Sequence, residues 1–336
     1  MLFLKDQAKE IIACLEEWAN HDGPVGTPTG IDGLDIITSG WLRQDLIYLV
    51  GDSGKGKSWL ASYFLLEAAK WTCHTSSKPL SKNPNDKPGL VLFWSLEMGE
   101  VPVISRLLAQ QMVTHLDGDT DLLDARDIRE NITAFSDIEI DQAFVKARDD
   151  FYGDLGEHIV LEFDTGSIEE LAVLMANLSE TYDILFVVVD YFRMISGSGS
   201  VDSIPAAQEN RSKDLKRLAK HFDCAVLSIF DINREGQKDT GGPSIHHMRG
   251  GSAAQYDADQ VLMLTWGEEN ALTRANYTPV TLRVAKNRNG PLGEVPLWIN
   301  LANGEVVQHN ADYNRQSARP MGPGMHARSN DFGITR

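Results

Sequence analysis

Residues 46–58 read LIYLVGDSGKGKS, and this stretch decides the fold class. An apolar run typical of a buried strand leads into a glycine-rich loop with the spacing GxxxxGKS at 51–58, and the residues up to 70 have a helical pattern. A strand, such a loop and a helix N-terminus in this order bind phosphate, because the loop N–H groups and the helix dipole point at the same anion. The stretch therefore predicts a P-loop nucleotide-binding domain.

The residue types in this loop match the groups of a nucleoside triphosphate and its metal ion. Lys57 is long enough to reach the β and γ phosphates, and Ser58 offers a hydroxyl ligand to Mg²⁺. We predict ATP as the nucleotide and Mg²⁺ as its metal. The predicted ATP-binding residues are Gly51, Asp52, Ser53, Gly54, Lys55, Gly56, Lys57, Ser58 and Trp59.

Apolar runs recur along the chain, separated by segments with a helical pattern. They lie at 46–50, 90–95, 159–163, 185–189 and 224–230. Such runs between helices indicate a buried parallel sheet flanked by helices, so the expected fold class is α/β. Three further candidate strands lie close together, and we expect them to extend the sheet in antiparallel orientation, at 260–264, 280–285 and 294–299.

Two carboxylates follow these runs, at the strand ends where open α/β sheets bind ligands. Asp190 ends the run 185–189 and is a candidate Mg²⁺ ligand beside Ser58. Glu97 follows the run 90–95 and is a candidate base for the attacking water. Without the P-loop, Asp190 would be interpreted as a turn residue and Glu97 as a carboxylate at a helix N-terminus.

Composition sets the class of protein. The chain has 336 residues, 42% of them hydrophobic, which suffices for one large core. No apolar run is long enough to span a membrane and the N-terminus does not have the pattern of a signal peptide, so we expect a cytoplasmic protein. Cys14, Cys73 and Cys224 are too few and too far apart to suggest a disulfide framework or a zinc site.

The net charge of −17 would argue against nucleic acid as a partner if the charge were spread evenly. Acidic residues instead concentrate in the N-terminal segment and from Asp117 to Glu170. Basic residues gather at 211–220, at Arg249 and at 283–288. This distribution fits a basic pore inside an acidic exterior.

The ends of the chain are expected to lie apart from the main domain. Residues 4–20 carry an apolar stripe at helical spacing, formed by Ala8, Ile11, Ile12, Leu15 and Trp18. The pattern fits equally a helix folded onto its own domain and a helix docked on a neighbouring subunit. We expect an N-terminal helix and linker at 1–25, an ATPase domain at 26–308 and a disordered tail at 309–336; residues 76–89 read as an exposed loop.

Several blocks in order resemble the RecA-type ATPase domain of DnaB-like hexameric replicative helicases. They are TPTGIDGLD (27–35), GDSGKGKS (51–58), VLFWSLEMGEVPVISRLLA (91–109), FVVVDYFRMISGSGS (186–200), MRGGSAAQYDADQVLML (248–264) and VAKNRNGPLGEV (284–295). The resemblance implies a RecA-like core in a ring of six copies that hydrolyses ATP, moves 5′ to 3′ along single-stranded DNA and unwinds duplexes. It also favours, of the two interpretations of the N-terminal helix, the one in which that helix docks on a neighbouring subunit.

The resemblance assigns further site residues. Arg288 would be an arginine finger and Lys286 its companion, both reaching the γ phosphate of the neighbouring subunit; on their own they would be interpreted as solvated charges on one strand face. The DNA-binding residues would be those of a central-channel loop, Arg249, Gly250, Gly251 and Ser252, with 196–200 as a second pore loop. A glycine-rich turn without a ligand is the competing interpretation.

Two departures from the family pattern stand out. After the run 224–230 the family places a Gln or His that senses the γ phosphate, whereas the aligned residue here is Asp231, unless a slip of the alignment brings Asn233 or Arg234 into that role. Few residues precede the block at 27–35, so the resemblance implies a chain without the N-terminal primase-binding domain, as in a phage or mobile element. Candidate partners are a primase or a helicase loader.

Two other functions share these motifs. A filament-forming recombinase of the RecA class would use the same P-loop, Glu97 and Asp190. A regulatory or loading ATPase would bind nucleotide to control a protein partner and would never translocate, and Asp231 is the feature that keeps this alternative open.

Overall fold

The computed structural model describes residues 12, 16, 23–75, 87–116, 120, 123–131, 135, 137–196, 204–232, 245, 248, 256–267 and 276–308. The segments expected as a tail at 309–336 and, for the most part, as a loop at 76–89 lie outside the described residues. Of the N-terminal helix expected at 4–20, only Ile12 and Glu16 are described, and both are helical. No helix among the described residues is long and apolar enough to cross a membrane.

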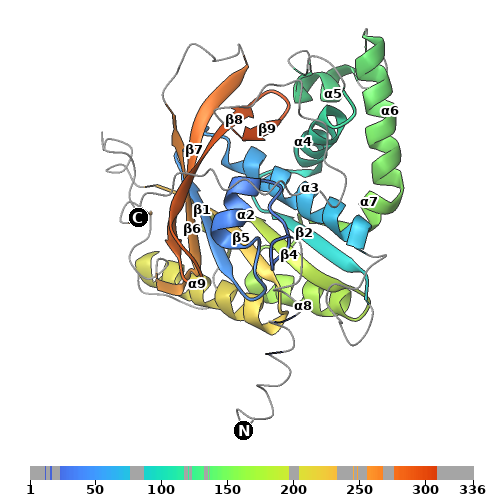
Figure 1. Cartoon of the computed structure of the whole chain (residues 1–336). Coiled ribbons are helices and arrows are strands. Elements are labelled where there is room, and N and C mark those ends of the chain that lie inside the picture. Colours follow the sequence, from blue (N-terminus) through green and yellow to red (C-terminus); the bar gives the residue numbers. More distant parts are fainter. Residues whose placement is uncertain are drawn as a thin grey trace.

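A nine-stranded sheet forms the centre of the domain (Figure 1), in the order β3-β2-β4-β5-β1-β6-β7-β8-β9. Its strands are β1 (Leu46–Gly51), β2 (Gly89–Ser95), β3 (Ile159–Glu162), β4 (Asp183–Asp190), β5 (Ala225–Asp231), β6 (Gln260–Trp266), β7 (Tyr277–Asn287), β8 (Gly293–Asn300) and β9 (Val306–Gln308). Strands β3, β2, β4, β5, β1 and β6 run parallel. The predicted α/β class with a mainly parallel sheet is confirmed.

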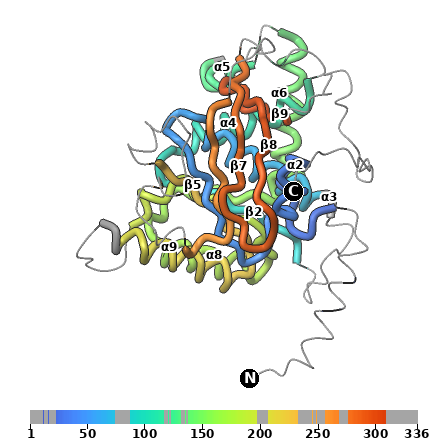
Figure 2. Tube along the Cα trace, turned by 60° about the vertical axis from the view of Figure 1, so that its left-hand side comes forward, coloured from blue at the N-terminus to red at the C-terminus, as the bar shows by residue number. Residues whose placement is uncertain are grey.

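The antiparallel extension begins one strand later than the sequence predicted. Residues 260–264 fall in β6, which pairs with β1 in parallel, so their predicted antiparallel orientation is wrong. The chain turns back only at the β6–β7 and β7–β8 connections, and β7 to β9 are antiparallel. Figure 2 shows β7 and β8 running side by side in orange and red. Apolar runs close together in sequence suggested antiparallel neighbours, but residues 232–259 separate β5 from β6 and leave enough chain for a parallel crossover.

Helices cover both faces of the sheet. They are α2 (Asp32–Thr38), α3 (Lys57–Thr75), α4 (Glu100–Val113), α5 (Ala125–Asn131), α6 (Ile138–Tyr152), α7 (Asp154–Glu157), α8 (Ile168–Ser179) and α9 (Ile204–His221), with a short 3₁₀ helix at Phe192–Met194. Figure 1 shows α8 and α9 together on one side of the sheet and α3 on the other.

The alternation of side chains along β1 divides the core into two layers. Ile47 and Leu49 point to the face covered by α2, α3, α4 and α7, whereas Tyr48 and Val50 point to the face covered by α8 and α9. A third apolar cluster joins α4, α5 and α6 at the margin. Because β1 is buried on both faces along its whole length, the loop after Gly51 starts from a rigid support.

Candidate nucleotide-binding site

The P-loop leaves the carboxyl end of β1 between the ends of β5 and β6 and enters α3 at Lys57. Gly54 and Gly56 have φ angles of +73° and +86°, which side-chain-bearing residues rarely adopt. A Cβ on Gly56 would also lie 3.1 Å from the Leu301 side chain. The glycines of the motif are therefore required by the backbone, as a phosphate-binding loop demands.

Lys57 is buried and folded back into the loop. Its Nζ donates to the carbonyl oxygens of Gly51 at 2.9 Å and Asp52 at 2.8 Å. It also lies 3.0 Å from the Asp231 carboxylate, at the end of β5. Since β5 is parallel to β1 and pairs Gly51 with Asp231, the sheet register fixes this ion pair. Asp231, which departs from the family pattern, thus directly contacts the lysine that the sequence predicts to bind phosphate.

Asp190 ends β4 and its side chain is buried at the same edge of the sheet. Burial raises its pKa to about 6, while a hydrogen bond from Ser58 and the nearby Arg106 and Lys57 oppose that shift. The structure therefore brings together Ser58 and Asp190, the two predicted Mg²⁺ ligands. An oxygen pair of this kind fits Mg²⁺, which takes few protein ligands and completes its shell with phosphate and water.

Glu97 follows β2 and is exposed to solvent. The adjoining turn is anchored to β4 because the Leu96 N–H donates to the Asp190 carbonyl at 2.7 Å. The helix after it, α4, begins only at Glu100, which is the carboxylate of its first turn. Glu97 therefore lies outside the helix, contrary to the alternative in which it complements the helix dipole. It is close enough to Asp190 to oppose that group's ionisation.

Arg106 is a site residue that the sequence reasoning missed. It lies on α4, where burial lowers its pKa and the negative charges of Asp190 and Glu97 act against that shift. Its guanidinium lies 5.2 Å from the centre of the Trp59 ring, a cation–π contact. Arg106 lies in the middle of α4, the helix that follows Glu97, and no local motif in the sequence pointed to it.

Two residues of the predicted ATP-binding stretch make cation–π contacts: Trp59 with the cation Arg106, and Lys55 with the aromatic ring of Trp266. The Trp59 ring packs beside Gly304, where an added Cβ would lie 2.2 Å from it, and supports Arg106. Lys55 Nζ lies 3.4 Å from the centre of the half-exposed Trp266 ring at the end of β6. Trp266 therefore borders the P-loop, and no motif in the sequence pointed to it.

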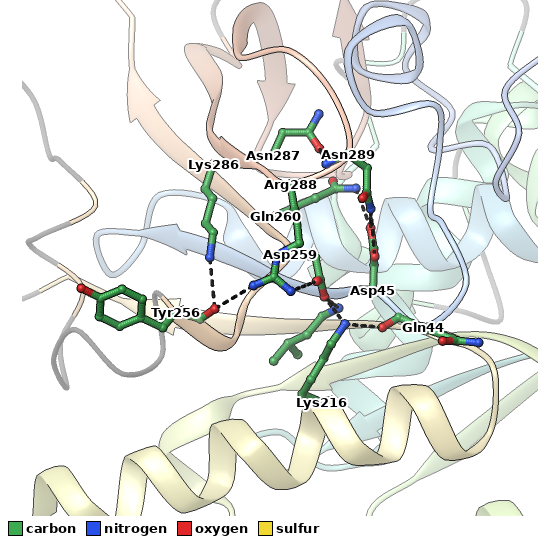
Figure 3. A network of polar contacts seen from close by, with 11 residues as sticks. Gln44, Asp45, Lys216, Tyr256, Asp259, Gln260, Lys286, Asn287, Arg288 and Asn289 are labelled. Carbon is green, nitrogen blue, oxygen red and sulfur yellow. Dashed lines mark hydrogen bonds and ion pairs between the residues drawn. The ribbon is translucent and has the colours of Figure 1, made fainter. Parts of the chain in front are cut away.

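Lys286 and Arg288 lie at the opposite ends of the strands, beside the amino end of β1, whereas the P-loop follows its carboxyl end. Lys286 lies at the end of β7 and Arg288 directly follows the strand (Figure 3). The end of β7 pairs with the start of β6, which lies next to the start of β1. With about 3.3 Å per residue, the six-residue strand β1 separates this edge from the P-loop by roughly 17 Å. The structure therefore does not bring the predicted finger to the nucleotide site of the same chain.

The predicted DNA-binding residues Arg249, Gly250, Gly251 and Ser252 lie outside the described residues, as do Asn233 and Arg234. Of the second predicted pore loop, only Ser196 is described, in a bridge with Ser167. Within the described residues there is no group of three or more His, Cys, Asp or Glu side chains that could hold a metal ion. A metal at the P-loop would thus depend on phosphate oxygens for further ligands.

A P-loop on the central strand β1, with carboxylates at the ends of the parallel strands β5 and β4, defines a nucleoside-triphosphatase domain of the RecA-like class. The model of the DnaB-like helicase C terminal domain matches residues 26–303. The chain therefore belongs to this family.

Relatives and solved structures agree with that assignment. The chain is 28% identical over 281 residues to the replicative DNA helicase DnaB of Mycoplasma pneumoniae, covering 80% of this chain and 54% of the relative. It is 25% identical to the replicative DNA helicase DnaC of Bacillus subtilis, covering 88% and 59%. The chain thus spans little more than half the length of these relatives.

Two solved structures share the fold. The ATPase domain of G40P superposes with a TM-score of 0.72 at 20% identity, covering 90% of this chain and 98% of that one. A DnaB-like replicative helicase described with its interactions with primase superposes with a TM-score of 0.71 at 21% identity, covering 88% and 67%. At these identities the likeness concerns the fold.

Proposed function

We propose that the chain is the ATP-hydrolysing motor of a replicative-type DNA helicase, acting as a ring of six copies that moves 5′ to 3′ along single-stranded DNA and unwinds duplexes. Ring size and polarity follow from the family. One observation carries the proposal: the P-loop with its carboxylates and the cations of the β7 end lie at opposite edges of one sheet. A single chain presents two halves of a site that cannot meet within it.

A head-to-tail contact between copies brings those halves together. The P-loop edge of one subunit then faces Lys286 and Arg288 of the next. Such a contact uses two different surfaces, so repeating it generates a closed ring or an open helix. The developing charge on the transferred phosphoryl group would be stabilised by a guanidinium from the neighbour, as in other P-loop enzymes with an arginine finger in trans.

Residues of the same chain would bind the nucleotide, hold the metal ion and activate the attacking water. Residues 51–59 bind ATP, and Lys57 exchanges its carbonyl and Asp231 contacts for phosphate oxygens. Ser58 and Asp190 would hold Mg²⁺, which when bound neutralises charge on the phosphates. Glu97 orients the attacking water and accepts its proton, and Arg106 offsets the charge of the two carboxylates.

Other parts of the proposal rest on sequence. Arg249 to Ser252 would track the DNA backbone through glycine amides and one cation, without base preference. The helix within residues 1–25 would dock on a neighbouring subunit, the domain at 26–308 would supply the motor, and 309–336 would be a tail. A primase or a helicase loader is the expected protein partner.

Asp231 favours a second candidate function. A carboxylate where a neutral or basic sensor is expected would weaken the coupling between the γ phosphate and movement, as suits a regulatory or loading ATPase. Such a protein would hydrolyse ATP regardless of single-stranded DNA and would not unwind a fork.

Electron microscopy with single-stranded DNA and a non-hydrolysable ATP analogue tests the proposal. Six-membered rings with DNA in the pore are expected, together with unwinding of a fork with a 5′ tail that the Lys57→Ala variant lacks. Open filaments that pair strands without unwinding would establish the recombinase alternative. ATP turnover that ignores DNA, without unwinding, would establish the regulatory one.

A further inference from the structure

Asp259 is a buried carboxylate at which several parts of the sheet edge meet (Figure 3). It precedes β6 and is 3% exposed. Its Oδ2 accepts hydrogen bonds from the Leu46 N–H, at 2.8 Å, and from the ammonium of Lys216 on α9. Its Oδ1 accepts a hydrogen bond from Nη1 of Arg288 at 2.9 Å. One side chain thus links β1, α9 and the end of β7.

Arg288 is held to the same segment by further contacts. Its backbone N–H donates to the Asp259 carbonyl at 2.9 Å. Its Nη2 donates to the Tyr256 carbonyl at 3.1 Å, and Lys286 Nζ donates to that oxygen at 3.3 Å. Both cations of the proposed finger pair therefore converge on residues 256–259, as Figure 3 shows.

These contacts hold the Arg288 guanidinium in place and use only some of its N–H donors. A guanidinium has five N–H donors, and the contacts to Asp259 and Tyr256 use one on Nη1 and one on Nη2. The Arg288 side chain remains 52% exposed. The other donors can therefore face a phosphate of an adjacent subunit while the inner side of the group stays bound.

The charges around Asp259 are arranged so that one oxygen serves Arg288. Lys216 and the Leu46 N–H satisfy Oδ2, which leaves Oδ1 to the guanidinium. The neighbouring buried carboxylate, Asp45, takes different partners: Gln260 at 3.2 Å and Asn289 at 3.4 Å. A matched carboxylate beside the network thus has no contact with the finger.

We infer that Asp259 is a positioning residue that holds Arg288 in the orientation needed to reach the ATP of the neighbouring subunit. The inference rests on the proposed function, because it requires Arg288 to act in trans. A free arginine side chain samples many rotamers, and fixing it before the reaction removes that entropy cost from the transition state. Asp259 acts through Arg288 and touches no nucleotide itself.

The Asp259→Asn variant tests this inference through hydrolysis in mixed assemblies. The variant alone is expected to lose at least tenfold in kcat while keeping its affinity for ATP, since its own P-loop is intact. Mixing it with Lys57→Ala subunits should restore turnover. In some interfaces, the P-loop then comes from the Asp259→Asn copy and a correctly held Arg288 from the other.

Two controls separate the possible outcomes. Asp45→Asn, which removes the adjacent carboxylate, should leave kcat within twofold of the wild type. Arg288→Ala mixed with Lys57→Ala reports on the finger itself, and failure of this pair to regain turnover would overturn the trans site and the inference together.

If the Arg288→Ala pair regains turnover, two results overturn the role of Asp259 alone. One is an Asp259→Asn variant with wild-type kcat. The other is a loss of kcat that mixing with Lys57→Ala does not restore, because that outcome means damage within the variant subunit itself.

Discussion

The carboxylate of Asp231 lies 3.0 Å from the ammonium of Lys57, and the sheet register that pairs Asp231 with Gly51 holds it beside the P-loop. The Asp231 side chain is 24% exposed and that of Lys57 8%, so water screens this pair only in part. In the proposed function, ATP binds the ammonium of Lys57 in place of Asp231, and the freed carboxylate repels the phosphate. Asp231 would therefore compete with the nucleotide for the lysine.

Asp231→Asn should bind ATP more tightly, because the amide keeps the size of the side chain and removes its charge. We expect the Kd for ATP to fall about tenfold, equivalent to about 1.4 kcal/mol. Titration calorimetry with a non-hydrolysable analogue measures it. Asp164→Asn is the control: it removes an exposed charge just after β3, at the same ends of the strands but outside the P-loop, and should change Kd less than twofold. Unchanged or weaker binding by Asp231→Asn would mean that Asp231 does not compete.

The sequence could predict the groups that a contiguous motif defines. The P-loop, Asp190 and Glu97 each follow a buried apolar run, and parallel strands place such residues at one edge of the sheet. Arg106 and Trp266 reach the same ends of the strands from the middle of α4 and from the end of β6, which neighbours β1 in the sheet but is distant from it in sequence. Their role depends on packing between distant elements, which a local pattern does not contain.

The direction of β6 and the contacts that hold Arg288 could not be predicted from the sequence for a related reason. Strand direction depends on the path of the preceding crossover, and an apolar run reads the same in both directions. Asp259 precedes such a run and looks like an ordinary turn residue. Only the register that sets Leu46 and Arg288 against it reveals its contacts.

Arg106→Gln should slow hydrolysis more than it weakens ATP binding. Without the guanidinium, Asp190 and Glu97 repel each other more strongly, and the pKa of Asp190 rises further above about 6. We expect kcat to fall about tenfold to hundredfold. This is less than the loss of about a hundredfold to a thousandfold for a donor that touches the transition state, because Arg106 acts through the two carboxylates. Steady-state kinetics at several Mg²⁺ concentrations measure this, and a higher Mg²⁺ requirement should accompany it.

Arg129→Gln serves as the matched control for Arg106. Arg129 lies on α5, is exposed, and adds only a like charge near Arg106. Its loss should leave kcat within twofold of the wild type. Equal effects of the two substitutions would show that general positive charge, and not the placement of Arg106, matters.

Asp35→Asn should stabilise the domain in a pH-dependent way. Burial raises the pKa of Asp35 from 3.8 to about 7, against hydrogen bonds from Thr29 that lower it. A raised folded-state pKa contributes stability below 3.8 that is lost as the pH rises to about 7. The amide of Asp35→Asn does not ionise and so does not lose this stability. The free energy of unfolding of the variant, relative to the wild type, should therefore increase by about 1–2 kcal/mol between pH 5.5 and 8.

Urea unfolding at the two pH values measures the Asp35→Asn effect. Asp32→Asn is the control, because Asp32 is an exposed carboxylate in the first turn of the same helix. It should lose a little stability at both pH values, since it favours the helix dipole. A pH-independent difference for Asp35→Asn would show that Asp35 ionises at its ordinary pKa in the folded protein.

Ile12→Glu should disrupt assembly without harming the nucleotide site. Ile12 is helical and 53% exposed, so contact with a partner would bury apolar surface that the described part of the chain leaves open. If that partner is a second subunit, the variant should shift the mass in solution from a ring to smaller species. ATP turnover should fall with it because composite sites are lost, while ATP binding persists.

Light scattering after gel filtration measures the mass, and Glu16→Gln, one turn further on, should leave it unchanged. A full-size ring for Ile12→Glu would refute the docking of this helix between subunits.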